Sequence, residues 1–360
     1  MIKIACVVGA RPNFMKIAPI LEAMKAYPEI IPLLVHTGQH YDFEMSQVFF
    51  NQLDIPEPQV NLGVGSESHA VQTAKIMLGF EKVVSHHKPD YILVVGDVNS
   101  TIACALVGVK MGVPVIHIEA GIRSGDKTMP EEINRVLTDH VSALLLTPTV
   151  FACDNLKREG ITKNVYLVGD VMVDTLLNHK DKAGQSGIKD TLSINGEDYC
   201  LMTLHRASNV DDKVNLSCII DAVDYIQRQI VVVLPLHPRT KAKLMQFKLN
   251  DKLSSMGKVI ITEPLGYLEC LNLMMGCKFV LTDSGGMQTE TTVLNIPCLT
   301  MRTNTERPET LMQGTNTLVG TQWITQDAQK ILDGNGKQGS YPKVWDGHTA
   351  ERIVSIISKL

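Results

Sequence analysis

The chain has little net charge, few aromatic residues and no long apolar run. Its 360 residues include 34 Lys and Arg against 38 Asp and Glu, a formal net charge of -4. A surface that binds nucleic acid needs an excess of cations, so we expect no nucleic-acid partner. No apolar stretch approaches the roughly 20 residues of a membrane-spanning helix, and the first residues, MIKIACVVGARPNF, lack the features of a signal peptide. We therefore expect a soluble, cytoplasmic protein with no membrane partner.

Motifs for redox cofactors and for metal ions are missing as well. No predicted strand is followed by the G-x-G-x-x-G fingerprint, which disfavours tightly bound NAD. The eight cysteines include no C-x-x-C pair, and several lie in apolar segments typical of strands. We interpret them as buried, reduced thiols rather than as disulfides or metal ligands. The sequence therefore predicts no metal site and no cofactor.

Short β-branched segments alternate with segments of helical period along the whole chain. The pattern starts with MIKIACVVG, IPLLVHT and DYILVVG, is interrupted by a polar stretch, and resumes with DYCLMTL and IVVVLPL. Such alternation is typical of βαβ units and parallel sheets, and the length exceeds that of one hydrophobic core. We predict an α/β fold with two Rossmann-like domains facing each other across a cleft. Their bounds are 1–178 and 198–347, with a hinge over 179–197 and a final helix over 348–360.

Cations follow the first predicted strand. Ligands of open α/β sheets bind beyond the carboxyl ends of the strands, so the residues there are candidates for function. In GARPNFMK, Arg11 and Lys16 flank Pro12 between the first strand and the first helix. Both are directed toward the top of the first sheet in this prediction. The alternative is a pair of solvated loop residues.

The motif DSGGMQTE places small residues where a strand turns into a helix. Free backbone N–H groups and the helix dipole at Ser284, Gly285 and Gly286 are suited to holding a phosphate, although an ordinary turn with a helix cap has the same pattern. The helix then carries Glu290. The loop after the next strand, in MRTNTERPE, supplies two cations of the kind that a pyrophosphate needs, Arg302 and Arg307. Together these features indicate a nucleoside diphosphate.

Three carboxylates are candidates for acid–base chemistry: Asp97 in VVGDVNST, Glu119 in HIEAGIRSGD and Glu131 in MPEEINR. Asp97 could instead cap a helix, and Glu131 could favour a helix dipole. Glu119 follows an apolar strand, so we expect it to be partly buried, an environment that suits proton transfer. His205 and His237 end strands of the second domain. For His205 we predict catalysis or a phosphate contact, whereas a lone histidine at a strand end is more often structural.

With these residues assembled, the chain resembles the non-hydrolysing UDP-N-acetylglucosamine 2-epimerases over its whole length. The motifs GARPNFMKIAP, TGQH, GDVNST, HIEAGIRSGD, MPEEINR, LHR, DSGGMQTE and TERPE occur in the family's order. The resemblance implies the GT-B arrangement, a final helix that returns to the first domain, and a homodimer. It implies catalytic roles for Asp97, Glu119, Glu131 and His205. It further implies nucleotide contacts from Arg11, Lys16, Ser284, Gly285, Gly286, Glu290 and Arg307.

The chain departs from the family pattern in three places. Many members have Glu where Asn13 stands, and the loop EPLGYLEC differs at Leu265 and Cys270 from the best-known branch. Some members bind a second substrate molecule at a regulatory site that includes the Gln-His of the TGQH-like motif. Gln39 and His40 match that site, but the two residues that follow do not, and GVGSES lacks its arginine. Regulation of this type is therefore not predicted.

The resemblance implies anti elimination of UDP to a 2-acetamidoglucal, followed by re-addition of UDP with a proton delivered to the other face of carbon 2. Which carboxylate is the acid and which is the base stays open. UDP has to remain bound meanwhile, so we expect a cleft that closes. The alternatives are a 2-epimerase of a UDP-linked diacetamido-glucuronic acid, a hydrolysing epimerase, a GT-B glycosyltransferase and a non-catalytic sensor of sugar nucleotides.

Overall fold

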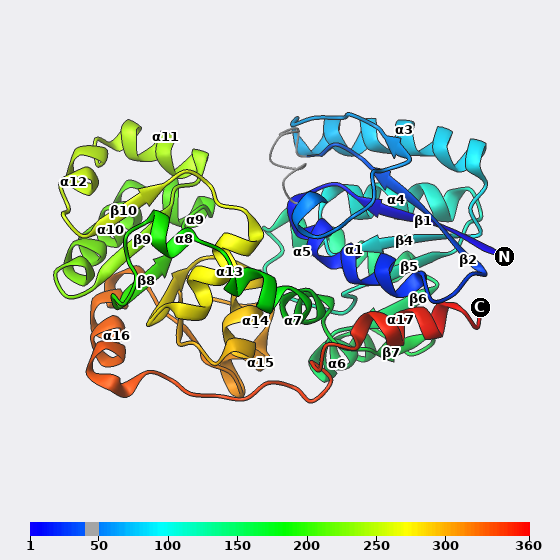
Figure 1. Cartoon of the computed structure of the whole chain (residues 1–360). Helices are drawn as coiled ribbons and strands as arrows, with labels where there is room; N and C mark the ends of the chain where they lie inside the picture. The colour runs from blue at the N-terminus through cyan, green and yellow to red at the C-terminus, as the bar shows by residue number, and fades with distance from the viewer. Residues whose placement is uncertain (40–49) are drawn as a thin grey trace. The chain divides into compact units, whose positions relative to one another are not determined.

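The computed structural model describes residues 1–39 and 50–360 and divides them into two compact units (Figure 1). The first unit contains Met1–Asn178 and Pro342–Leu360, and the second contains His179–Tyr341. The boundary between Asn178 and His179 lies within helix α7 (Val171–Gly184). His40, which the resemblance relates to a regulatory site, lies outside the described residues.

A parallel sheet forms the centre of the first unit. The described strands lie in the order β3-β2-β1-β4-β5-β6-β7. Their bounds are β1 (Ile2–Val8), β2 (Ile30–His36), β3 (Val60–Asn61), β4 (Tyr91–Val95), β5 (Val115–Ile118), β6 (Leu144–Thr147) and β7 (Val165–Leu167). The helices of this unit whose bounds lie within the described residues, besides the start of α7, are α1 (Arg11–Met24), α3 (His69–His87), α4 (Asn99–Lys110), α5 (Pro130–Val141), α6 (Val150–Arg158) and α17 (Thr349–Ile357).

The second unit repeats this plan with the strand order β10-β9-β8-β11-β12-β13. Its strands are β8 (Tyr199–Met202), β9 (Val231–Pro235), β10 (Val259–Thr262), β11 (Phe279–Thr282), β12 (Cys298–Thr300) and β13 (Asn316–Leu318). Its longer helices are α10 (Lys213–Gln227), α11 (Pro238–Phe247), α13 (Tyr267–Gly276) and α14 (Gly285–Leu294). Shorter helical segments are α8 (Ile188–Thr191), α9 (Ala207–Val210), α12 (Asn250–Ser254), α15 (Pro308–Met312), η1 (Thr321–Trp323), α16 (Ile324–Lys330) and η2 (Ile331–Asn335). The α/β class with two Rossmann-like sheets is therefore confirmed.

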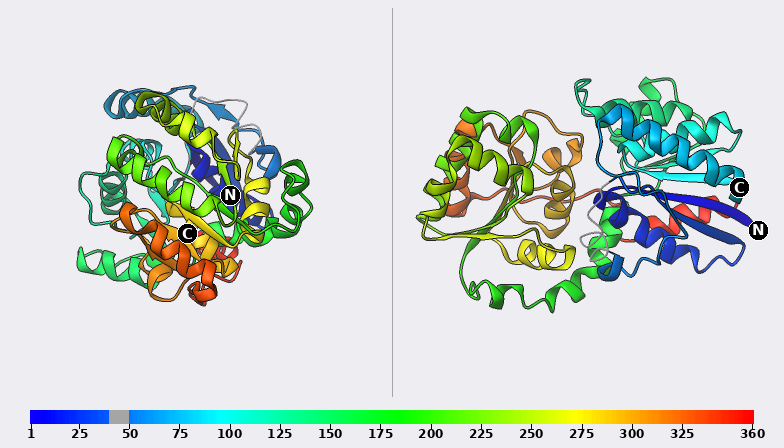
Figure 2. Two further views of the ribbon diagram at one scale, coloured as in Figure 1. Left: turned by 90° about the vertical axis from the view of Figure 1, so that its left-hand side faces the viewer. Right: turned by 90° about the horizontal axis from the view of Figure 1, so that it is seen from above.

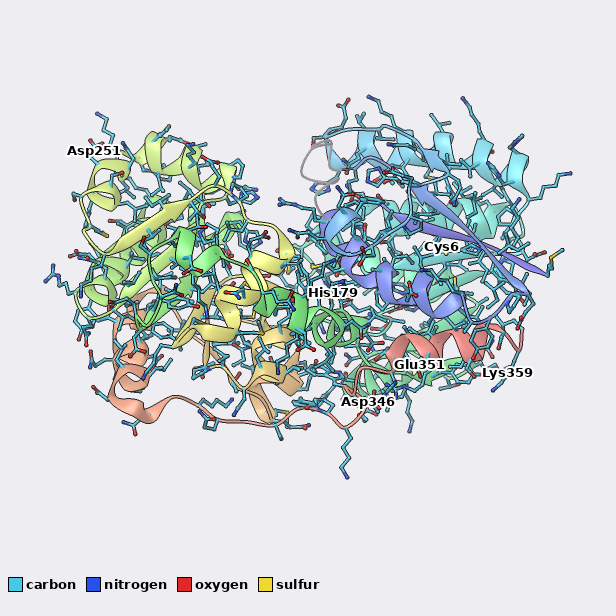
Figure 3. The ribbon with its side chains drawn as sticks, viewed as in Figure 1. Cys6, His179, Asp251, Asp346, Glu351 and Lys359 are labelled. Carbon is cyan, nitrogen blue, oxygen red and sulfur yellow. The ribbon has the colours of Figure 1, made fainter. Side chains whose placement is uncertain are left out.

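Helices cover both faces of each sheet, which explains why the strands are near-continuous apolar runs. Strands β4 and β11 illustrate this, because Ile92–Val95 and Phe279–Leu281 are at most 1% exposed. All eight cysteines are free thiols, and burial raises the pKa of Cys6 (labelled in Figure 3) to about 12. Cys153, Cys218 and Cys270 are only partly buried. None of the described helices has the length and apolar character that a bilayer crossing requires.

Each sheet has one point where its strand order reverses. In the first unit this point lies between β1 and β4, and in the second it lies between β8 and β11. In open α/β sheets of this kind, ligands bind beyond the carboxyl ends of the strands at such a point. The loops after β1, β4, β8 and β11 therefore lie where such sheets bind their ligands.

The end of the chain belongs to the first unit, where α17 packs beside α1 (Figures 1 and 2). The fully buried Trp345 donates from Nε1 to the carbonyl of Pro148 at 3.1 Å. Asp346, labelled in Figure 3, accepts hydrogen bonds from Arg352, which lower its pKa to about 2. On the helix itself, Ile353 and Ile357 are 0% exposed. The last segment is thus part of the core of this unit.

We expect Ile353→Val to lower the free energy of unfolding of the chain by about 0.5–1.5 kcal/mol, because it deletes a methyl group from a packed core. Ile356→Val is the matched control, since Ile356 lies on the same helix and is only partly buried. Urea titration followed by circular dichroism measures both. Equal effects of the two substitutions would contradict the packing described for α17.

Candidate active site

Asn13 organises the loop after β1, which carries Arg11 at the start of α1. Its side-chain oxygen accepts hydrogen bonds from the amides of Gly9 and Ala10, at 3.1 and 3.0 Å. Its side-chain nitrogen donates to the carbonyl of Val95 at the end of β4, at 3.1 Å. A glutamate at this position could not donate to that carbonyl. Asn13 therefore joins the two loops that flank the reversal point of the first sheet.

Lys16 and Glu119 form a buried ion pair at the same edge of the sheet. They are 8% and 7% exposed, and the Lys16 ammonium donates to a carboxylate oxygen of Glu119. Gly96 lies against the pair, because a Cβ atom on it would be 2.9 Å from Lys16 Nζ and 3.4 Å from Glu119 Oε2. Its φ of +67° also favours glycine. Lys16, predicted as a nucleotide contact, thus has a carboxylate partner in this structure.

The backbone of Glu119 is strained. Its φ is +71°, in the left-handed region that residues other than glycine rarely adopt. The amides of Glu119 and Ala120 both donate to the carbonyl of Leu146, at 3.0 and 3.1 Å, and hold the turn in place. Such strain costs about 1–3 kcal/mol and persists where the surroundings enforce it, often at functional sites. Strand β5 consequently ends at Ile118, and the next carboxylate is directed toward Lys16.

Asp97 follows β4 and is held by helix α5. Arg135 donates to its carboxylate, and Asn134 donates to its backbone carbonyl at 2.9 Å. Glu131 lies three and four residues before these two partners, so it shares their face of α5. Glu131 thus lies on the same helix as the partners of Asp97, with its side chain exposed.

Glu132, the neighbour of Glu131, has a structural role instead. It is 4% exposed and accepts from the amides of Ser124 and Gly125, both at 2.9 Å. It also contacts Arg135 at 3.2 Å. The two adjacent glutamates therefore differ, because one fixes a loop and the other is directed to solvent.

His117 is a site component that the sequence reasoning missed. It lies within β5 and is 0% exposed; its Nδ1 lies 2.7 Å from Asp139 Oδ1, and its Nε2 lies 2.9 Å from the carbonyl oxygen of Gly96. Asp139 also accepts from the amide of Gly121 and contacts Arg123 at 2.7 Å. Burial alone would raise the pKa of Asp139, but His117 and Arg123 hold it below its ordinary value. The available signal was a histidine inside an apolar strand, since a buried imidazole needs partners.

In the second unit, Asp283 orients His205. Asp283 follows β11, is 0% exposed, and accepts from the amides of His205 and Arg206, at 3.0 and 2.8 Å, and from the side chain of Asn209 at 3.2 Å. The Nδ1 atom of His205 lies 3.0 Å from its carboxylate. Burial alone would raise the pKa of Asp283, but His205 and these amides lower it. With Nδ1 occupied, Nε2 of His205 has no partner among the described residues.

His237 has a different role from His205. Its ring centroid lies 5.6 Å from that of His205, and its Nδ1 accepts from the amide of Arg239 at 3.2 Å. It therefore caps helix α11. Of the two histidines, which follow β8 and β9, His205 lies at the reversal point between β8 and β11.

Ser284 and Gly285 begin helix α14 at the same reversal point. The Ser284 amide donates to Thr282 Oγ1 at 2.9 Å, but its hydroxyl does not cap the helix. The first N–H groups of a helix have no partner within it, so this end attracts an anion. A Cβ atom on Gly285 would lie 2.7 Å from Glu306 Oε1. Ser284, Gly285 and Gly286 thus lie at the N-terminal end of α14, with the Glu306 carboxylate beside them.

Glu290, Arg302 and Arg307 are buried near this helix, at 5%, 8% and 4% exposed. Glu290 lies on α14. The pKa of Tyr267 is raised, first by burial and then by the nearby Glu290 carboxylate. The loop after β12 is tied to α14 because Thr305 donates to the side chain of Gln288 at 2.6 Å.

Among the described residues, no three His, Cys, Asp or Glu side chains are grouped as ligands for a metal ion.

The chain is similar in sequence to known UDP-sugar 2-epimerases. The family model for UDP-N-acetylglucosamine 2-epimerase matches residues 22–358. A UDP-N-acetylglucosamine 2-epimerase homolog of Methanococcus maripaludis is 44% identical over 99% of this chain and 100% of its own length. The UDP-2,3-diacetamido-2,3-dideoxy-D-glucuronate 2-epimerase of Pseudomonas aeruginosa is 40% identical over 99% of this chain and 100% of its own.

A solved structure agrees with these relatives. The UDP-GlcNAc 2-epimerase of Methanocaldococcus jannaschii, in complex with UDP-GlcNAc and UDP, is 42% identical and has a TM-score of 0.93. The match covers 100% of both chains.

Proposed function

Because the chain belongs to the UDP-N-acetylglucosamine 2-epimerase family, we propose that it interconverts UDP-N-acetylglucosamine and UDP-N-acetylmannosamine without hydrolysis. The observation that carries this proposal is the placement of Asp97 and Glu119 directly beyond the adjacent strands β4 and β5. Each carboxylate is paired with a cation, Arg135 for Asp97 and Lys16 for Glu119. Positioned carboxylates of this kind are suited to moving a proton on carbon 2.

The proposed reaction is redox-neutral. One carboxylate removes the proton from carbon 2, the bond between carbon 1 and the UDP oxygen breaks, and a double bond forms between carbons 1 and 2. UDP then adds back to carbon 1 while a proton is delivered to the opposite face of carbon 2. Asp97, Glu119 and Glu131 supply the base and the acid. The carbon 2 proton is weakly acidic, so its removal is coupled to the departure of UDP.

Stabilising the departing UDP is the task that we assign to the second unit and to the loop after β1. Negative charge grows on the diphosphate in the transition state, and groups preorganised to receive it lower the barrier. We assign this task to the start of α14 and to Nε2 of His205, whose Nδ1 faces Asp283. The proposed UDP contacts are Arg11, Lys16, His205, Ser284, Gly285, Gly286, Glu290 and Arg307.

The test is product analysis after incubation of the full chain with UDP-N-acetylglucosamine in heavy water. We expect a UDP-sugar that is inverted at carbon 2 and carries deuterium there, detected by NMR and mass spectrometry. Release of free sugar with UDP indicates a hydrolysing epimerase. Transfer of the sugar to an acceptor, with no exchange at carbon 2, indicates a glycosyltransferase, and either outcome would overturn the proposal.

A second candidate substrate is UDP-2,3-diacetamido-2,3-dideoxy-D-glucuronate. The 40% identity to the Pseudomonas aeruginosa enzyme supports it. The same carboxylates would act, because the reacting carbon and the leaving group are unchanged. Comparing kcat/KM for the two UDP-sugars identifies the substrate. The homodimer and the cytoplasmic location stay predictions.

A further inference from the structure

His117 is a fully buried side chain that the proposed reaction does not use. It stands in the apolar strand β5, where a polar ring is costly unless both of its nitrogens have partners. One nitrogen faces the carboxylate of Asp139 at 2.7 Å and the other faces the carbonyl of Gly96 at 2.9 Å. A carbonyl and an ionised carboxylate only accept, so a ring with a proton on each nitrogen satisfies both. The ring thus joins α5 to the loop after β4.

At one end, the ring fixes the residue that precedes Asp97. Strand β5 holds both backbone groups of Gly96, because its amide donates to the carbonyl of Ile118 at 3.1 Å and its carbonyl faces Nε2 of His117. The φ of Gly96 is +67°, so the chain turns sharply there. The direction in which the backbone enters Asp97 is therefore set from β5.

At the other end, Asp139 fixes the turn that follows Glu119. Its Oδ1 faces His117, while its Oδ2 accepts from the amide of Gly121 at 3.0 Å and contacts Arg123 at 2.7 Å. Gly121 comes two residues after Glu119, and its φ of +80° belongs to the same turn. Asp139 is 1% exposed, so these contacts are shielded from water. One buried carboxylate therefore joins the ring of His117 to the turn behind Glu119.

We propose that the pair of His117 and Asp139 positions the two carboxylates that move the proton on carbon 2. His117 acts through the carbonyl before Asp97, and Asp139 acts through the turn after Glu119. The inference rests on the proposed function, in which a proton leaves one face of carbon 2 and another arrives on the opposite face. That reaction needs both carboxylates at fixed places around the substrate, and a misplacement of about 1 Å can lower a rate about 100-fold.

The experiment compares His117→Gln with His117→Asn in the full chain. The amide nitrogen of Gln lies as many bonds from Cβ as Nε2 does, and that of Asn as many as Nδ1 does. Gln therefore keeps a donor for Gly96, whereas Asn keeps only the contact with Asp139. We expect kcat for UDP-N-acetylglucosamine to fall roughly 100-fold in His117→Asn and less than about 10-fold in His117→Gln, in which Gly121 and Arg123 still hold Asp139. The dissociation constant for UDP, from calorimetry, should change less than about twofold in both.

The difference between the two variants separates positioning from stability alone. A purely structural ring would lower the melting temperature in both variants and leave the kcat of the folded protein the same in both. His86→Asn is the matched control, because His86 is exposed near the end of α3, and its kcat should equal that of the wild type. Equal losses of kcat in the two His117 variants overturn the inference, as does a wild-type kcat in His117→Asn.

If neither His117 variant folds, Asp139→Asn decides. It keeps the size of the side chain and an acceptor for the amide of Gly121, but it removes the charge that faces the ring. A fall of kcat of several-fold with unchanged UDP affinity supports the inference, and an unchanged kcat overturns it. A wild-type chain that does not epimerise UDP-N-acetylglucosamine would instead contradict the proposed function itself, so the two failures are distinguishable.

Discussion

Replacing Glu119 by Gln is expected to lower the rate of epimerisation about 100-fold or more, while UDP still binds. Glu119 is buried, paired with Lys16 and held in a strained backbone conformation, so its carboxylate has a defined position. The amide of Gln keeps the shape but can no longer accept or deliver a proton at carbon 2. The measurement is turnover of UDP-N-acetylglucosamine, with UDP affinity from calorimetry and the melting temperature alongside.

The other candidate carboxylates and a control complete this test. Asp97→Asn and Glu131→Gln should also lower turnover strongly, with UDP binding retained. Glu81→Gln is the control, because Glu81 is exposed on α3 and belongs to no site described above. Near-normal turnover in all three carboxylate variants would overturn the proposed mechanism.

Replacing Asp283 by Ala is expected to lower the free energy of unfolding at pH 7 by about 3–5 kcal/mol, the usual cost of removing one partner from a buried charged network. The substitution leaves the amides of His205 and Arg206 and the side chain of Asn209 without their acceptor. His205 also loses the contact that orients its ring, so turnover should fall as well. Urea titration of the full chain measures the change in stability.

The stability difference should depend on pH in a defined direction. The folded protein holds the pKa of Asp283 below its ordinary value of 3.8, so its stabilising charge is fully present above that value. The contribution is lost as the pH falls through the lower, folded pKa. The difference between wild type and Asp283→Ala should therefore shrink as the pH falls below 3.8.

Asp224→Ala is the control for this experiment. Asp224 pairs with Arg228 on the surface, so its removal should cost less than about 1 kcal/mol. Equal losses in the two variants, or a difference for Asp283→Ala that grows in acid, would contradict the role described for Asp283.

Much of the fold was predictable because its signals are local. Fully buried parallel strands need apolar residues at every position, and the helices between them need a helical period, so the alternation is visible in short segments. The candidate residues were found for a related reason. Parallel strands end at the same edge of a sheet, so Arg11, Asp97 and Glu119 were expected there from their places after strands. Their roles in catalysis stay predictions.

The partners of these residues were not predictable, because they come from distant segments. Lys16 and Glu119 are 103 residues apart, and Asp283 and His205 are 78 apart. Which loops meet depends on the strand order, and that order is set by the packing of whole helices and strands.

The sequence by itself determined the class of fold, the family, and which side chains follow the strands, since each of these depends on the order of residues along the chain. The tertiary structure alone decided how those side chains are held. It pairs Lys16 with Glu119, places His117 between Asp139 and Gly96, and uses Asp283 to orient His205. The physical reason is that a buried charge or imidazole must find its partner in space, and neighbours in space are settled only when the sheet is assembled.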